Sequence, residues 1–364
     1  MAKMDDESLL SFLQAEEEEA GDYVWGKLAD DREKALREYQ RMPYGDEEDG
    51  RSEFVTSDVN DTIEWVLPSL LKIFTSGDQA VSFDPSSEED VQSAEQATEA
   101  CNYVFYKQNN GFLILHSAFK DALILKNAAV MWRWKEVKTT ETNSFKGLSD
   151  DQLALVMQQL KAQKLEPEIV TGTSQEVLDS ATGLPVTVND VRIRTMKKRG
   201  FVCVEAFPPD ELLVKRLWTS PLLDDCPYVC RMMPVTLSEL REMGYDVDAD
   251  DLQVADRVES SSDRMLRESD ADASGNSWAQ NPRRQQTEDE SRTEGWLRIE
   301  YVLVDYDGDG ISERRRVVRL HDKILENEPC SHVPIATSSP VLRSHRWDGM
   351  SLAELVSDIQ RLNT

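Results

Sequence analysis

The chain has 364 residues, with 69 Asp and Glu against 41 Lys and Arg, and its formal net charge is −28. This length predicts two or three structural units, and a 40% hydrophobic content with eight Trp and ten Phe excludes wholesale disorder. A protein this acidic has no general electrostatic attraction for DNA, so any nucleic-acid contact must be local. Solubility alone explains the charge equally well.

The N-terminal residues and the cysteine pattern indicate the cellular compartment in which the chain is made. The first ten residues, MAKMDDESLL, carry acids where a signal peptide carries bases, and no apolar segment follows them. The most apolar stretch, 65–74, is too short to span a bilayer. Five scattered Cys without a CxxC pair favour reduced thiols over a zinc site. We therefore expect a soluble protein made inside the cell, without membrane contact.

The first third of the chain is typical of helices. Apolar residues at three-and-four spacing predict helices over 5–42, 56–75, 88–108 and 112–126, with a short strand at 80–83. The run Glu16–Glu19 is interpreted as a solvated face or a break between two helices.

Strands become prominent further on. We expect a core strand over 128–137, a helix over 149–163, a hairpin of 186–196 and 201–207, a strand over 226–233 and a helix over 236–243. The hairpin turn is placed at Lys197–Gly200, because Gly follows three basic residues there. The alternation around Trp132 and Trp134 favours core packing over base stacking.

The last third begins with a polar stretch. Residues 258–293 have almost no apolar side chains and are predicted to be a disordered loop. Strands follow over 297–304, 313–320 and 323–327, and then a helix over 351–362 with Leu352, Leu355, Val356, Ile359 and Leu362 on one side. This helix has no stop signal, so we expect the natural protein to continue beyond it.

These elements predict an α+β fold in four parts. The parts are an acidic helical segment (1–50), an α+β region (51–257), the polar loop (258–293), and a β-hairpin followed by a helix (294–364).

The sharpest local motif is Asp305-Tyr306-Asp307-Gly308-Asp309-Gly310. Asp305, Asp307 and Asp309 match the opening of a calcium loop, but Arg316 stands where the closing Glu is needed. A Gly-rich hairpin turn explains the motif better than a structural calcium ion, and the sequence suggests no other cofactor.

The strand after this turn is basic. Arg314 and Arg316 share one side of it, and we interpret them as partners of nearby acids rather than of phosphates, while keeping them as candidates for a channel wall or a subunit interface. No P-loop, GxSxG or HExxH motif is present, so we expect a protein that is not an enzyme.

Long segments, in order, resemble the N-terminal part of portal proteins of short-tailed bacteriophages. They include RMPYGDEEDGRSEFVTSDVNDTIEWVLPSLLKIFTSGDQAVSFDP, EQATEACNYVFYKQNNGFLILHSAFKDALILKNA, PPDELLVKRLW, RMMPVTLSELREMGYD, VDYDGDGISERRRVVRLHDKILENE and SHRWDGMSLAELVSDIQRLNT. The resemblance runs from about residue 20 to 364, apart from the polar stretch.

The resemblance implies a ring subunit, dodecameric in the family, at one vertex of the virion capsid. It implies a portal fold with a helical and β wing up to about residue 235, a clip-like or wing-adjacent hairpin, and the start of a stem helix at Ser351. It also implies terminase, tail or head-completion proteins and capsid or scaffold protein as partners, assembly in the host bacterial cytoplasm, and passage of double-stranded DNA.

On this reading, Leu352, Leu355 and Ile359 become candidates for a channel wall or subunit interface. Two alternatives stay open: a capsid or scaffold protein without DNA contact, and a metal-dependent nuclease using Asp305–Asp309.

Overall fold

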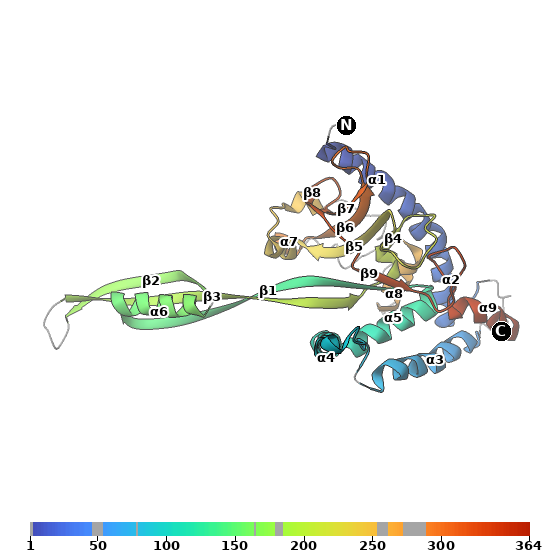
Figure 1. The fold of residues 1–364 in the computed structure, drawn as a ribbon, viewed down its shortest axis with the longest axis horizontal. Helices are drawn as coiled ribbons and strands as arrows, with labels where there is room; N and C mark the ends of the chain where they lie inside the picture. The colour runs from blue at the N-terminus through green and yellow to red at the C-terminus, as the bar shows by residue number, and fades with distance from the viewer. Residues whose placement is uncertain are drawn as a thin grey trace. The chain divides into compact units, whose positions relative to one another are not determined.

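The computed structural model describes residues 3–45, 54–77, 79–163, 165–178, 185–252, 261–271 and 289–364. The chain forms two compact units. Unit 1 comprises Met1–Trp132 and Val204–Thr364, and unit 2 comprises Arg133–Cys203. Helices and antiparallel strands occur in both, so the predicted α+β class is confirmed (Figure 1). No helix in the described ranges is long and apolar enough to cross a bilayer.

Unit 1 contains most of the helices. They are α1 (Asp6–Asp22), a π-helical turn (Tyr23–Leu28), α2 (Ala29–Tyr39), α3 (Asp58–Thr75), α4 (Val91–Asn102), α5 (Gly111–Leu125), α7 (Leu237–Met243), α8 (Ser262–Ala271) and α9 (Leu352–Asn363). The helix predicted over 236–243 is confirmed as α7 and begins with a capping box: the Thr236 hydroxyl accepts the N–H of Glu239, and the Glu239 carboxylate accepts the N–H of Thr236. Gly244 ends this helix at φ +100°, a left-handed conformation that suits glycine.

A five-stranded antiparallel sheet forms the centre of unit 1. Its order is β4-β5-β6-β7-β8, from Leu212–Val214, Tyr228–Thr236, Glu294–Val304, Glu313–Arg319 and Ile324–Pro329. The β6–β7 hairpin around the Asp-rich turn is therefore confirmed. Leu9, Leu13 and Val24 of the N-terminal helices belong to the same buried cluster as the sheet residues, so the amphipathic start of the chain covers this sheet.

A second apolar cluster joins helices that are distant in sequence. Val59, Ile63, Leu67 and Leu71 follow a spacing of four along α3, and they are buried against α2, α5, α8 and α9. The apolar stripe predicted for this helix is confirmed.

Unit 2 is built from two long strands, a shorter one and a helix. They are β1 (Ala128–Ser149), α6 (Asp150–Ala162), β2 (Glu166–Leu178) and β3 (Pro185–Ala206), with β1 and β3 shared with unit 1. β2 pairs antiparallel with β3 from Glu166↔Met196 to Leu178↔Pro185. In unit 1 the first residues of β1 pair with β9 (Ile335–Ser338). Ser149 caps α6, as its side chain and that of Gln152 exchange hydrogen bonds with each other's backbone.

The predicted hairpin turn at Lys197–Gly200 is wrong, because β3 runs through it without interruption. Gly200 has a packing role instead: a Cβ there would lie 2.2 Å from the indole ring of Trp134. A glycine inside a strand thus marks a close approach. Trp134 is 64% exposed, so its predicted place in the core is also wrong.

The expected strand at 80–83 does not form. The N–H groups of Ala80 and Val81 donate to the Asn102 side chain at 2.7 and 3.3 Å, and the N–H of Phe83 donates to the Thr98 hydroxyl at 3.0 Å. Side chains of α4 satisfy this extended backbone in place of a neighbouring strand.

The prediction of a disordered loop over 258–293 is wrong for Ser262–Ala271, which forms α8 with Asp263 and Leu266 buried. Residues 258–260 and 272–288 lie outside the described residues. Charged partners rather than apolar residues hold most of α8, which is why a hydropathy pattern misses it.

Candidate functional site

The Asp-rich turn is closed by its own backbone. The Asp305 carboxylate accepts the N–H groups of Gly308, Asp309 and Gly310 at 2.8, 3.1 and 2.9 Å. Asp309 accepts the N–H of Ile311 at 2.8 Å, and both glycines have positive φ. No group of three or more His, Cys, Asp or Glu in the described parts of the chain is arranged to hold a metal ion. The geometry favours the turn interpretation, and calcium binding by Asp305, Asp307 and Asp309 stays a prediction.

The two arginine candidates on β7 have intramolecular partners. Arg314 donates to the carbonyl of Cys226 at 3.1 Å, and Arg316 forms an ion pair with Glu326 at 2.5 Å. Arg315, on the other side of the strand, contacts Glu313 and lies over the Tyr306 ring. The interpretation as a partner of a nearby acid is confirmed for Arg316, whereas the contact of Arg314 is with a backbone carbonyl. A role of either residue in a channel wall or a subunit interface stays a prediction.

A buried charge cluster joins α1 to the sheet. Glu17 contacts Arg298 with both carboxylate oxygens at 3.0 Å and also binds Arg319, which pairs with Glu300 at 2.7 Å. Tyr228 donates to Glu300 at 2.8 Å. Burial alone would raise the pKa of Glu17, but the charges of Arg298 and Arg319 outweigh it and hold that pKa below its ordinary value.

The interpretation of Glu16–Glu19 as a solvated face or a helix break is therefore wrong. α1 continues through it, and Glu16 and Glu19 both bind Lys215 at 2.8 and 2.7 Å. Nothing in the local sequence identifies these partners, because they lie about 200 to 300 residues away.

A third set of buried charges holds α8. Asp210 binds Arg264 and Arg267, and Arg264 also lies 3.4 Å from Glu211 and stacks over the Trp296 ring. Burial, followed by the charge of Asp210, raises the pKa of Glu211 to about 7. Arg264 and Arg267 of α8 thus bind the two acids of the Asp210–Glu211 turn, so this cluster connects α8 to the rest of unit 1.

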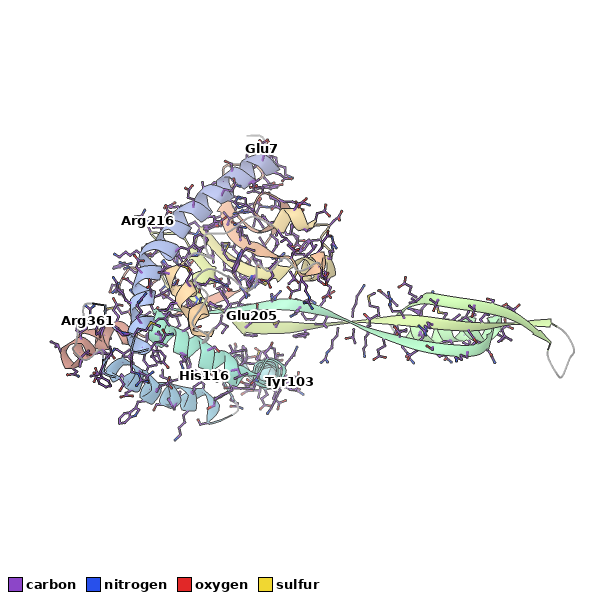
Figure 2. All side chains as sticks on the ribbon, turned by 180° about the vertical axis from the view of Figure 1, so that it is seen from behind. Glu7, Tyr103, His116, Glu205, Arg216 and Arg361 are labelled. Carbon is purple, nitrogen blue, oxygen red and sulfur yellow. The ribbon has the colours of Figure 1, made fainter. Side chains whose placement is uncertain are left out.

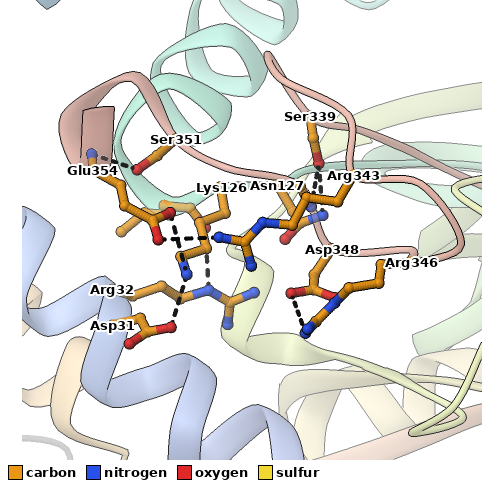
Figure 3. A network of polar contacts seen from close by, with 12 residues as sticks. Asp31, Arg32, Lys126, Asn127, Ser339, Arg343, Arg346, Asp348, Ser351 and Glu354 are labelled. Carbon is orange, nitrogen blue, oxygen red and sulfur yellow. Dashed lines mark hydrogen bonds and ion pairs between the residues drawn. The ribbon is translucent and has the colours of Figure 1, made fainter. Parts of the chain in front are cut away.

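The start of α9 is fixed by a polar network (Figure 3). Lys126, at the end of α5, is almost fully buried and binds Asp31 of α2 at 2.8 Å and Glu354 of α9 at 3.4 Å. Arg343 reaches the other oxygen of Glu354 at 3.2 Å, and the Ser351 hydroxyl caps the helix by accepting the N–H of Glu354 at 3.0 Å. This arrangement ties the first turn of α9 to two other helices.

The loop before α9 is held in the same network. The Asn127 amide donates to the Ser339 hydroxyl at 3.0 Å, and Arg346 makes a bidentate ion pair with Asp348 at 2.9 Å (Figure 3). Tyr23 donates to Asp348 at 3.1 Å, and burial together with that carboxylate raises the pKa of Tyr23 to about 12.

The inner edge of α9 is polar. Gln360 is fully buried, accepts the N–H of Val59 at 2.9 Å and donates to the carbonyl of Glu38 at 3.0 Å. Ser357 donates to the Glu38 carboxylate at 2.6 Å. The last turns of α9 are therefore oriented by hydrogen bonds to α2 and α3.

The outer edge of α9 is apolar. Leu355, Ile359 and Leu362 are 46%, 52% and 87% exposed, while Leu352 and Val356 are half-buried against the second apolar cluster. Arg361, labelled in Figure 2, belongs to the same exposed last turn. The five apolar residues do lie on adjoining faces, as the sequence predicts. Only the structure shows which part of the stripe is covered: Ala353, Leu352 and Val356 pack inward beside Ser357 and Gln360, whereas Leu355, Ile359 and Leu362 remain exposed.

The spacing of this outer edge is informative. Leu355, Ile359 and Leu362 are separated by four and three residues, the spacing of side chains along one face of a helix that packs on another helix. We call Leu355, Ile359 and Leu362 the outer edge of α9.

Comparison with protein families gives a match over nearly the whole chain. The model of the family described as Phage SU10 portal protein matches residues 9–364. A comparison with individual curated proteins finds no match.

Proposed function

The chain belongs to the phage SU10 portal protein family, and from this premise we propose that it is a ring subunit of the portal vertex. It is a structural portal protein of a bacteriophage virion, from a family without enzymatic activity. The proposed ring, dodecameric as the sequence resemblance implies, is the channel for DNA packaging and ejection. Its partners are terminase, tail or head-completion proteins and capsid or scaffold protein, and it assembles in the host bacterial cytoplasm. Neither the scaffold nor the nuclease alternative is favoured by the family match.

The observation that carries the ring proposal within this structure is the outer edge of α9. A closed ring needs a head-to-tail interface, in which one surface of a subunit meets a different surface of its neighbour. Leu355, Ile359 and Leu362 provide an apolar surface on a helix whose position is fixed at both ends, by Glu354 and by Gln360. Such a preorganised surface binds without first being ordered, which lowers the cost of association.

The net charge supports the role of a conduit. With −28 per subunit, an assembled ring is strongly acidic, and acidic walls repel phosphates. DNA can then slide without deep binding minima, and we propose a channel that is mainly acidic with isolated basic rings. A continuous basic channel in an electron cryomicroscopy map of the ring would refute this part of the proposal.

Electron microscopy and mass photometry of the full chain test the assembly. We expect rings with a central hole for the wild type and a strong shift to monomers for the double variant Leu355→Ser/Ile359→Ser. Each side chain is about half exposed, so burying the pair contributes about 2 kcal/mol per interface, roughly 30-fold in the concentration needed for assembly.

A matched control changes two other exposed apolar residues, Leu217 and Ile311, to serine; they are 80% and 72% exposed and lie outside α9. This control should assemble like the wild type. A wild-type chain that stays monomeric at high concentration would contradict the ring proposal. Equal assembly of the α9 variant would exclude its outer edge as the contact.

A further inference from the structure

The charge of the chain is divided unevenly between its two units. Unit 2, residues 133–203, has eleven Lys and Arg against nine Asp and Glu. The remaining residues, which form unit 1, have 30 Lys and Arg against 60 Asp and Glu. Unit 2 is therefore slightly basic in a protein that is otherwise strongly acidic.

The basic residues of unit 2 gather on two strands. Lys197, Lys198 and Arg199 of β3 and Lys135 of β1 are exposed, and we call these four residues the basic ribbon. Lys198 pairs with Glu166 of β2 at 3.0 Å. Within the described residues the other three cations have no ion pair, so their charge is available to a partner.

The strand geometry fixes how the ribbon is presented. Alternate residues of a strand point to opposite faces, so Lys197 and Arg199 share one face of β3 while Lys198 points to the other. The Trp134 ring against Gly200 holds β1 and β3 together at this point. The ribbon is thus a paired, ordered surface with an exposed tryptophan in it, and not the solvated turn that the sequence predicted.

A segment of unit 1 has the opposite character. No Lys or Arg occurs between Lys72 and Lys107. Within that stretch Asp84, Glu88, Glu89, Asp90, Glu95 and Glu99 are all exposed. Within the described ranges none of these six acids has an ion-pair partner. Glu95 and Glu99 are one turn apart on α4, and Tyr103, labelled in Figure 2, follows the helix directly.

We propose that the basic ribbon of one copy docks on the acidic face of α4, around Glu95 and Glu99, of a second copy of this chain. The proposal rests on the ring function proposed above and names a second contact between its subunits. Ribbon and acidic face are different surfaces, so the contact is head-to-tail and compatible with ring closure.

The fixed charges of the two surfaces favour a second copy over nucleic acid. The ribbon also suits phosphates, and the net charge of −28 opposes the approach of DNA and of a second copy alike, so the preference depends on the local partner that each offers. The α4 face of a neighbour offers unpaired carboxylates, and pairing them relieves the repulsion between acidic subunits. Complementary charge of this kind sets orientation and association rate more than affinity, and it weakens with salt.

The first test reverses charge in the full chain. Lys197→Glu/Arg199→Glu should need about tenfold more protein to assemble at low salt, and the difference should shrink as salt is raised. The control Lys146→Glu/Lys161→Glu makes the same change of net charge at two other exposed residues of unit 2 and should assemble like the wild type. Adding Glu95→Lys/Glu99→Lys to the ribbon variant should restore assembly.

The second test detects proximity. Cys101 of α4 is exposed, so Arg199→Cys and a short bismaleimide should link neighbouring copies into a ladder of oligomers on a denaturing gel. The same variant with Cys101→Ser should give no ladder. Linkage confined to single chains would show an intramolecular contact and overturn the proposal.

Two further outcomes separate the possibilities. If the wild type forms rings and the variant Lys197→Glu/Arg199→Glu forms rings of the same stability and salt dependence, the α4 contact is refuted. The ring proposal itself is unaffected by that result. If the variant instead loses affinity for a fluorescent DNA duplex without any change in assembly, the ribbon is a DNA contact and this inference is wrong.

Discussion

Replacing Glu17 with alanine removes a carboxylate that faces two buried guanidinium groups. Arg298 and Arg319 are 1% and 0% exposed, and Glu17 lies 3.0 Å from the Nε of Arg298. After the substitution Arg319 keeps Glu300, whereas Arg298 loses the carboxylate that contacts its Nε with both oxygens at 3.0 Å. Removing a carboxylate from a buried arginine is costly, because that carboxylate compensated for part of the hydration lost on burial.

The expected loss is about 3 kcal/mol, the lower end of the range for breaking a buried pair, because Arg319 retains its ion pair with Glu300. With a urea dependence of about 3 kcal/mol/M, the unfolding midpoint of unit 1 should fall by about 1 M. Glu18→Ala is the matched control: Glu18 is the next residue of α1 and is exposed, so its change should stay within about 0.5 kcal/mol.

Urea titration followed by tryptophan fluorescence and circular dichroism measures both variants. The pKa of Glu17 is lowered in the folded state, so its stabilising effect is present above the unfolded pKa and is lost as the pH falls through the folded one. The difference between wild type and Glu17→Ala should therefore narrow in acid. Equal midpoints for Glu17→Ala and Glu18→Ala at pH 7 would refute this account of the cluster.

Three other changes follow from single contacts. Gly200→Val should destabilise unit 2, seen as faster proteolysis within 133–203, because its Cβ would overlap the Trp134 ring, and unchanged proteolysis would contradict that packing. Gln360→Leu should cost about 1–3 kcal/mol in urea unfolding by leaving the Val59 N–H and Glu38 carbonyl buried without partners, whereas exposed Asn363→Leu should not. Burial and Asp210 raise the pKa of Glu211 from 4.5 to about 7, so this group stabilises the fold below the unfolded pKa and loses that effect as the pH rises to about 7. Glu211→Gln should flatten this part of the stability profile in urea titrations between pH 5 and 8, and an unchanged slope would rule out Glu211 as its source.

Local sequence determined the elements whose stability is local. The stripe of α3, the capping boxes of α6 and α7 and the β6–β7 hairpin each depend on residues a few positions apart, so spacing is sufficient to predict them. The long ordered segments also identified the family, which the match over residues 9–364 confirms.

Only the tertiary structure determined the buried ion pairs and showed that the predicted turn at 197–200 is part of a strand. Glu17 meets Arg298 and Arg319 across about 300 residues, and the polar helix α8 is held by acids from a distant turn. From the sequence Gly200 predicts a turn, whereas in the structure it lies inside a strand and makes room for the Trp134 ring. Ion pairs and close backbone contacts depend on which segments meet, and a linear pattern contains no information on that.

The same reason explains α9. Its apolar stripe is visible in the sequence, but the side of the helix that faces the protein is determined by Glu354, Ser357 and Gln360, whose partners lie on α2, on α3 and at the end of α5. The sequence determines that the helix is amphipathic, and packing determines that its outer apolar edge remains exposed.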